Sequence, residues 1–193
     1  MRAGSVTIKA DWVMHADAWD LRLFQAVHAA TQPSPVALMV ARILADGPAL
    51  LTAALLIGLI AVPCGEMRVS AFRAAGLAVA ALMVNGLIGL LWDRPRPFVA
   101  GAGPAWIAHA ATSSFPSNHL TAQWVIAGVL LLDRRTRPWG LIVAVLGLPM
   151  AWARVYLGVH YPSDMLGALG VAGLAMLSAW LVIRRRTRPL TPP

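Results

Sequence analysis

Cysteine and acidic residues are scarce in this sequence, and charge of either sign is sparse. Cys64 is the only cysteine, which excludes an intrachain disulfide and a zinc site built on cysteines. Only 12% of the 193 residues are charged, whereas about a quarter of the residues in soluble globular domains are charged. The chain therefore lies outside the ordinary soluble class, and its 59% hydrophobic content favours a membrane protein.

No cleavable signal peptide is evident, because charged residues from Lys9 to Arg22 interrupt every apolar stretch near the amino terminus. The formal net charge of +8 comes largely from arginines in short clusters beside apolar runs. In such positions arginines anchor and orient membrane helices. We therefore expect the basic residues to set membrane topology, and we expect no nucleic-acid partner.

Long apolar runs are what the sequence does contain. A helix needs about 20 residues to cross a hydrocarbon core of ~30 Å, and the runs predict an all-α, polytopic transmembrane bundle of about five spans. An N-terminal amphipathic or interfacial segment is expected over residues 1–35, a transmembrane domain over 36–185 and a cytoplasmic basic tail over 186–193. The predicted spans are residues 36–62, 72–92, 117–132, 139–156 and 162–183.

The segment before the first span has two interpretations. Residues 12–30 place aromatic and aliphatic side chains at roughly helical spacing among charged positions. This pattern suits an amphipathic helix at the membrane interface, and equally a leader helix packed on the bundle. Within the first span, Arg42 and Asp46 are four residues apart on one helix face, and we expect them to pair because an isolated charge there is costly.

The basic clusters predict which side of the membrane each loop occupies. With five spans, Arg68, Arg73, residues 134–137 and the basic tail fall on one side. The positive-inside rule makes that side cytoplasmic. Both long polar loops then face outward, and so does the amino terminus. If the amphipathic region instead crosses the membrane, the loops stay outward and the amino terminus lies inside.

Three polar clusters interrupt the apolar chain, and this topology places all three at the same membrane surface. The clusters are Arg94-Pro95-Arg96-Pro97-Phe98 after the second span, Ser117-Asn118-His119 at the start of the third, and Arg154 with His160 and Asp164 between the fourth and fifth.

These residue types suit an anionic substrate. Guanidinium groups are always charged and match phosphate oxygens, so Arg94, Arg96 and Arg154 are candidate phosphate ligands. Ser117 opens a predicted helix after a proline, and the free N–H groups and positive dipole at such a terminus attract phosphate. The Ser117 hydroxyl and the Asn118 amide would add donors.

His160 and Asp164 are four residues apart, so they approach either on one helix face or within a turn. Asp164 would hold one imidazole nitrogen protonated and leave the other free to attack phosphorus. His119 would then be the general acid for the departing oxygen. Taken singly, each group has a plainer interpretation: arginine anchors, a helix cap, a structural histidine, or metal ligands together with His109. Their occurrence together on one side favours catalysis.

The three clusters, in this order, resemble the signature of the type 2 phosphatidic acid phosphatase superfamily over roughly residues 85–167. The resemblance implies a phosphohistidine mechanism with no metal and no organic cofactor. The implied roles are His160 as nucleophile, Asp164 as its partner, His119 as acid, and Arg96, Ser117, Asn118 and Arg154 as phosphate ligands.

Departures from the family pattern point to one branch. Gly89 stands where the first motif commonly has lysine, and Arg94 is a hypothetical replacement for that cation. Ala153 stands where a serine is common. Asn118 is a near isostere of the aspartate common in the bacterial undecaprenyl-diphosphatase branch, which the chain resembles most. In that branch His109 would either contact the second phosphate of the substrate or cap the loop, and the sequence favours neither role over the other.

The resemblance implies an enzyme that hydrolyses undecaprenyl diphosphate to undecaprenyl phosphate and inorganic phosphate, with links to cell-wall biogenesis and bacitracin resistance. It implies a multi-pass protein of the bacterial inner membrane whose partners are this lipid and the bilayer, and whose site faces the periplasm or exterior. Two alternatives stay open: a phosphatidic acid or phosphatidylglycerol phosphate phosphatase, and a non-enzymatic binder or transporter of phosphorylated lipids.

Overall fold

The computed structural model describes residues 18–29 and 31–186, and in this part of the chain all regular structure is helical. The predicted all-α class is confirmed. Residues 12–17 of the expected amphipathic segment, and residues 187–193 of the expected basic tail, lie outside the described residues. The helices are α2 (Ala18–Val27), α3 (Pro35–Ala61), α4 (Gly65–Leu91), α5 (Asn118–Leu131), α6 (Arg137–Tyr156) and α7 (Pro162–Arg186).

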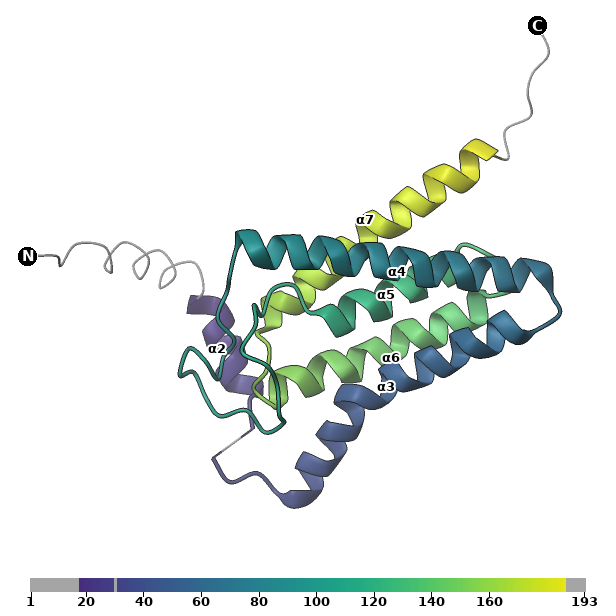
Figure 1. Cartoon of the computed structure of the whole chain (residues 1–193). Helices are drawn as coiled ribbons and strands as arrows, with labels where there is room; N and C mark the ends of the chain where they lie inside the picture. Colours follow the sequence, from purple (N-terminus) through teal and green to yellow (C-terminus); the bar gives the residue numbers. More distant parts are fainter. Residues whose placement is uncertain (1–17, 30, 187–193) are drawn as a thin grey trace, which may run out of the picture.

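The helices α3 to α6 run alternately up and down a single bundle, with α7 crossing behind it (Figure 1). The centre of the bundle is α5, which packs against α4, α6 and α7, while α3 packs on α6 and α4. Four helices are long and apolar enough to cross a membrane: Pro35–Ala61, Gly65–Leu91, Arg137–Tyr156 and Pro162–Arg184. Large apolar side chains such as Leu90 and Leu174 are exposed on their outer faces, as expected where lipid replaces water.

The central helix α5 agrees with the predicted third span but is short. Its 14 residues extend roughly 21 Å at 1.5 Å per residue, less than a hydrocarbon core. Asn85 Nδ2 donates to Asn118 Oδ1 (2.9 Å) at the start of α5. Since Asn85 is six residues before Leu91, the end of α4, the first turn of α5 lies roughly 9 Å inside the bundle. The amino terminus of α5 is therefore recessed behind the loop of residues 92–117.

Most span boundaries agree with the prediction, and one does not. The helix of the second span, α4, begins at Gly65, seven residues before the expected start at Phe72. Glu66 in its first turn suits the positive end of the helix dipole, so these polar residues extend the helix instead of ending it. The connection from α3 is correspondingly short.

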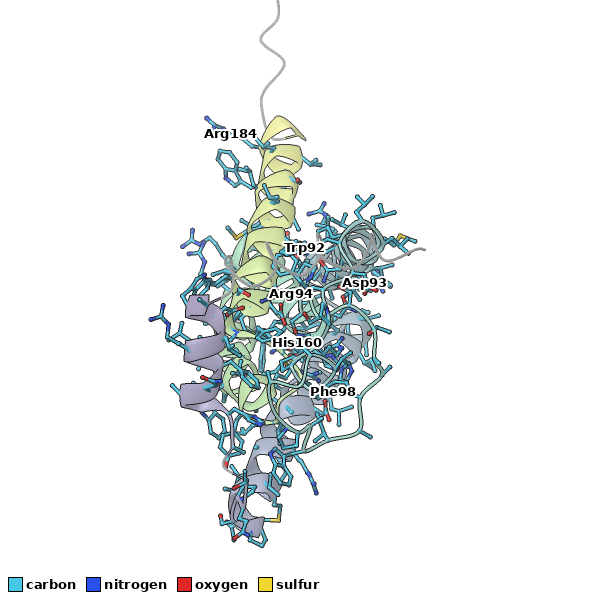
Figure 2. The ribbon with its side chains drawn as sticks, turned by 90° about the vertical axis from the view of Figure 1, so that its left-hand side faces the viewer. Trp92, Asp93, Arg94, Phe98, His160 and Arg184 are labelled. Atoms are coloured by element: carbon cyan, nitrogen blue, oxygen red, sulfur yellow. The ribbon has the colours of Figure 1, made fainter. Side chains whose placement is uncertain are left out.

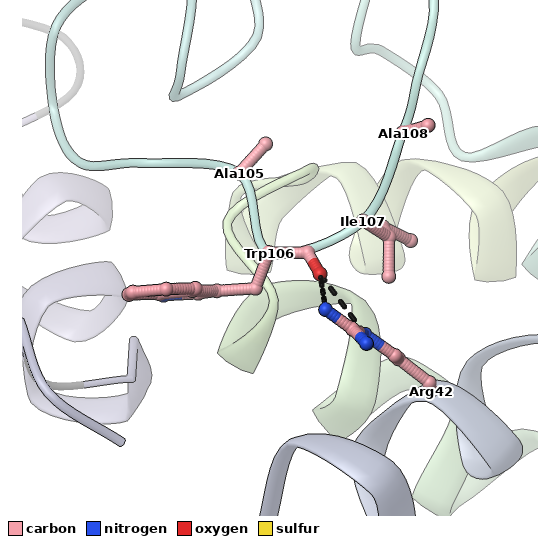
Figure 3. Close-up of a pocket in the computed structure, with 5 residues that line it drawn as sticks. All are labelled: Arg42, Ala105, Trp106, Ile107 and Ala108. Carbon is pink, nitrogen blue, oxygen red and sulfur yellow. Dashed lines mark hydrogen bonds between the residues drawn. The ribbon is translucent and has the colours of Figure 1, made fainter. Parts of the chain in front are cut away.

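The predicted pair of Arg42 with Asp46 is wrong. Arg42 donates from Nε (3.1 Å) and Nη2 (2.9 Å) to the carbonyl oxygen of Trp106, beside an open hollow of about 560 Å³ lined by Arg42 and residues 105–108 (Figure 3). Asp46 instead accepts from Arg154 Nη2 (2.7 Å). An exposed pair within one helix is worth only about 0.2–0.5 kcal/mol, whereas the buried guanidinium of Arg154 needs a counter-charge.

Candidate active site

The three polar clusters of the sequence meet at one end of the bundle. The end of α4, the loop after it, the start of α5 and the α6–α7 junction lie there with α2, while the α3–α4 and α5–α6 connections lie at the other end (Figure 1). Figure 2 shows Arg94 and His160 in the body of the molecule and Arg184 at the far end of α7. The basic turn of residues 134–137 is at the end opposite the clusters.

A helix cap delivers His160 to this end. After α6 ends, Gly158 takes a positive φ of 78°, and two hydrogen bonds close the cap: Gly158 N to Val155 O (3.0 Å) and Val159 N to Arg154 O (3.2 Å). This is a Schellman motif, which favours glycine in the left-handed position. A Cβ at Gly158 would also clash with the carbonyl oxygen of Pro104. The cap therefore turns the chain sharply between Arg154 and His160.

His160 lies in the turn before α7 and pairs with Asp164 in the first turn of that helix, so the pair forms where the turn meets the helix. Asp164 Oδ2 accepts from His160 Nδ1 (3.0 Å) and from the backbone N–H of Tyr161 (2.8 Å). A carboxylate can only accept, so Nδ1 carries the proton and Nε2 keeps its lone pair. Both side chains are fully buried or nearly so. Burial lowers the pKa of His160 to about 4 against the opposing effect of Asp164, so the imidazole is neutral near pH 7.

Arg96 faces the free nitrogen of this imidazole. Its Nη1 lies 3.1 Å from His160 Nε2 and donates to Val159 O (3.0 Å). Its Nη2 donates to Thr112 Oγ1 (3.2 Å) and to Ser113 O (3.0 Å), which ties the side chain to the 92–117 loop. The structure thus brings Arg96 and the candidate nucleophile together as predicted.

Arg94 has a different position from the one expected of a phosphate ligand. Its Nη1 donates to Asp164 Oδ1 (2.8 Å) and its Nη2 to Asp20 Oδ2 (2.6 Å), so the buried guanidinium lies between two aspartates. These contacts place it on the side of Asp164 away from His160. Arg94 holds the carboxylate that holds the histidine, and the idea that it replaces the family lysine at Gly89 finds no support in these contacts.

Asp20 is a site residue that the sequence analysis missed. It lies on α2, is fully buried, and accepts from Arg94 and from both the N–H (2.9 Å) and the hydroxyl of Ser163. Through these bonds α2 docks against the start of α7. Among several acidic residues in a mixed polar segment, nothing in the pattern distinguished Asp20.

Arg154 forms a second buried group with residues of α3. Only 1% of its side chain is exposed, and Nη2 donates to Asp46 Oδ1 (2.7 Å) and Ala45 O (3.3 Å). Asp46 Oδ1 also lies 3.8 Å from His119 Nε2. Asp46 was missed as a site residue because its spacing from Arg42 indicated a pair within the helix.

The start of α5 supplies the remaining predicted groups. Ser117 is the N-cap; its backbone N–H donates to Asp164 O (3.2 Å), while its hydroxyl makes no capping bond. The Asn118 amide oxygen is occupied by Asn85, which leaves the Asn118 NH₂ group as a donor. Asn85, buried on α4, is a third residue that sequence reasoning did not assign to the site.

The two remaining histidines lie close to these groups. The ring of His109 stands edge-on to that of His160, with centroids 6.1 Å apart. Its Nδ1 donates to Ala110 O (3.1 Å), a local loop contact, and burial lowers its pKa. The choice between a second-phosphate contact and a loop cap stays open. His119 lies within electrostatic range of four cationic or imidazole side chains, those of Arg154, His160, His109 and Arg96.

Several buried polar atoms around His160 have no partner in the described part of the chain. They are Arg96 Nε, Arg154 Nε, Arg154 Nη1 and Ser117 Oγ. Buried polar groups are normally hydrogen-bonded, so these four atoms are candidate contacts for a ligand. Three of the four are guanidinium N–H groups, so the complementary ligand is an anion with several oxygens.

Comparisons with known proteins agree with this chemistry. The sequence profile of the PAP2 superfamily matches residues 70–188. Undecaprenyl-diphosphatase BcrC from Bacillus subtilis (strain 168) is 43% identical over 94 residues, covering 49% of this chain and 48% of BcrC. Putative undecaprenyl-diphosphatase YbjG from Escherichia coli (strain K12) is 43% identical over 110 residues, covering 56% of this chain and 54% of YbjG. The matches therefore span about half the length of these relatives.

Solved structures share the fold. The crystal structure of Aquifex aeolicus LpxE superposes with a TM-score of 0.69 at 17% identity, covering 84% of this chain and 95% of LpxE. That of a transmembrane PAP2-type phosphatidylglycerolphosphate phosphatase from Bacillus subtilis gives 0.67 at 19% identity, covering 95% of this chain and 91% of the phosphatase. With its apolar helices, the chain is a multi-pass membrane protein. The profile match extends over more than half of the sequence and includes all three polar clusters, and the chain belongs to the PAP2 superfamily.

Proposed function

We propose that this protein is a membrane lipid phosphatase that hydrolyses undecaprenyl diphosphate to undecaprenyl phosphate and inorganic phosphate. The observation that carries the proposal is the buried, neutral His160, whose Nδ1 is held by Asp164 and whose Nε2 lies among donors without partners. The family supports the phosphatase activity. The choice of lipid rests on BcrC and YbjG, which carry undecaprenyl-diphosphatase in their names.

In the first step, the Nε2 lone pair of His160 attacks the terminal phosphorus. The N–P bond forms as the bond from phosphorus to the bridging oxygen breaks, and His119 gives its proton to that oxygen, which leaves on undecaprenyl phosphate. The imidazole gains positive charge, and Asp164 stabilises it through Nδ1 (3.0 Å). Arg94 and Tyr161 N keep Asp164 in place during this step.

In the second step, water attacks the phosphohistidine. His119, now neutral, takes a proton from the water, the N–P bond breaks, and its electron pair returns to Nε2 of His160. Inorganic phosphate leaves with the original protonation of both histidines restored. His119 thus acts as acid and then as base, so no net proton is required from elsewhere.

The unpartnered donors act on the transferring phosphoryl group. Phosphoryl transfer concentrates negative charge on the equatorial oxygens, and fixed positive donors stabilise it without reorganising. Arg96 Nε, Arg154 Nε and Nη1, and Ser117 Oγ are available for these oxygens. The amino terminus of α5 adds the positive end of its dipole.

We also propose that the site faces the exterior of a bacterial inner membrane. The support is the position of the basic turn, residues 134–137, and of Arg184 at the end of the molecule opposite His160. Lysine- and arginine-rich turns stay on the cytoplasmic side. A site at the outer surface would meet the diphosphate that lipid-linked glycan transfer leaves in the outer leaflet.

The experiment that tests the substrate is a comparison by purified protein in detergent. Phosphate release is measured with undecaprenyl diphosphate, a diacyl phosphatidic acid and phosphatidylglycerol phosphate, each at matched mole fraction. We expect the highest kcat/KM with the polyprenyl diphosphate. Preference for phosphatidylglycerol phosphate would refute that choice and agree with the similarity to phosphatidylglycerophosphatase B of Haemophilus influenzae (40% identical over 91 residues). Phosphate release by His160→Ala at the wild-type rate would refute the catalytic mechanism.

A further inference from the structure

Asp46 lies outside the region that the family profile matches, yet its carboxylate is part of the site. It belongs to α3, and α3 packs against α6, which carries Arg154. One oxygen, Oδ1, accepts from Arg154 Nη2 at 2.7 Å and lies 3.8 Å from His119 Nε2. The same atom therefore neighbours a candidate phosphate ligand and the candidate acid.

For Arg154, Asp46 determines which donors stay available. The guanidinium is buried, and its own helix α6 contains no aspartate or glutamate. Asp46 and Ala45 O occupy Nη2, while Nε and Nη1 have no partner among the described residues. Because the guanidinium is planar and rigid, fixing one nitrogen orients the other two.

For His119, Asp46 supplies negative charge in surroundings that are otherwise positive. Arg154 and Arg96 lie within electrostatic range of this imidazole. Within the described part of the chain, Asp46 is the carboxylate that lies within 4 Å of it. A nearby carboxylate favours the charged imidazole, and a general acid must carry its proton when the substrate arrives.

We propose that Asp46 is a positioning residue of the phosphatase, acting through Arg154 and His119 in the way that Asp164 acts through His160. The proposal rests on the proposed function. Each of the two proposed catalytic histidines, His119 and His160, then has its own aspartate, one near the surface and one buried. Asp46 is 60% exposed, and Asp46→Asn keeps a side-chain oxygen that can accept from Arg154 Nη2, which limits the cost of this substitution in folding.

A purely structural counter-ion would give a different result. If Asp46 only neutralised Arg154, its removal would weaken phosphate binding and would act independently of His119. If Asp46 also supports the acid, its effect on kcat must become smaller once His119 is gone, because only the part that acts through Arg154 remains. A double-mutant cycle separates these two cases.

The test compares Asp46→Asn, His119→Ala and the double variant with the wild type, with kcat and KM measured on undecaprenyl diphosphate. We expect Asp46→Asn to lower kcat by about 10- to 100-fold, the usual effect of removing an outer partner of a site residue. In the His119→Ala background the same change should lower kcat by a factor several times smaller than in the wild type. Asp46→Glu should restore part of the activity. An equal loss in both backgrounds, or no loss in either, would overturn the proposal.

Glu66→Gln is the matched control. Glu66 is also an exposed carboxylate paired with an arginine, Arg135 Nε (2.9 Å), but it lies at the other end of α4 from the site. It removes the same charge, and we expect it to leave kcat within twofold of wild type.

A second measurement does not depend on turnover. Calorimetric titration with inorganic phosphate, the proposed product, should give a several-fold larger Kd for Asp46→Asn than for wild type, because Arg154 is then held less firmly. Unchanged phosphate affinity would refute the part of the proposal in which Asp46 acts through Arg154. Failure of the wild type on every phosphorylated lipid would instead refute the proposed function, while the phosphate titration would still decide whether Asp46 orients Arg154.

Discussion

Arg154→Ala is the substitution for which the structure gives the clearest magnitude. Two guanidinium nitrogens, Nε and Nη1, are buried without partners and are assigned here to phosphate oxygens. A hydrogen bond to a charged group contributes about 1.5–3 kcal/mol, so losing two removes about 3–6 kcal/mol of transition-state stabilisation. At about 1.4 kcal/mol per factor of ten, kcat/KM should fall roughly 10²- to 10⁴-fold. Asp46 loses its partner but is mostly exposed, which limits the cost in folding.

The assay is phosphate release from undecaprenyl diphosphate by purified variants in detergent, with kcat and KM determined separately and the Tm recorded for each. Arg135→Ala is the matched control, since it removes an exposed, paired arginine at the far end of the bundle. We expect it to stay within twofold of wild type. Activity of Arg154→Ala within threefold of wild type, with a similar Tm, would refute the assignment of its free nitrogens to the substrate.

Three further predictions concern the support of the nucleophile. Because the pKa of His160 is lowered to about 4, it stays neutral as the pH falls below 6.5, and the acid limb of kcat/KM should lie below pH 6.5; a limb above 6.5 would contradict this. Asp20→Asn leaves buried Arg94 with a single carboxylate, so the free energy of unfolding should fall by about 3 kcal/mol in detergent denaturation, and an unchanged value would count against it. Gly158→Ala forces a left-handed φ and a clash, so stability should fall by about 1–3 kcal/mol, unlike Gly173→Ala, where a Cβ meets nothing within 4 Å.

The helices could be predicted because each membrane span corresponds to one continuous apolar run in the sequence. Four of the five predicted span starts lie within two residues of the observed ones, and the fifth, at Gly65, was missed because polar residues at the start of a helix resemble a loop. The His160–Asp164 pair could also be predicted, since the two residues are four apart and this spacing limits them to a few geometries.

Contacts between helices could not be predicted from the sequence in the same way. Asp20 and Arg94 are 74 positions apart, and Asp46 and Arg154 are 108 apart, so no local period relates them. A single aspartate on an apolar helix suggests a partner one turn away, and only packing of α3 on α6 reveals the distant one. These long-range carboxylates are the part of the site that required the structure.

Arg94 and Arg96 show a related limit. Both are arginines followed by proline, and both lie in the same loop, so the sequence offered no reason to give them different roles. Prolines on either side favour an extended, polyproline-like backbone, in which residues two apart do not share a face. In the structure Arg94 points to Asp20 and Asp164, and Arg96 to His160. The side chain that faces the substrate is therefore decided by tertiary contacts.

The central claim is that phosphate passes through His160. Rapid quenching of the wild type with undecaprenyl diphosphate labelled with ³²P at the terminal phosphate should trap label on the protein as an acid-labile, alkali-stable phosphohistidine. Peptide mapping should place it at residue 160, and His160→Ala should carry none. Label on another residue, or phosphate release by His160→Ala at the wild-type rate, would contradict the account.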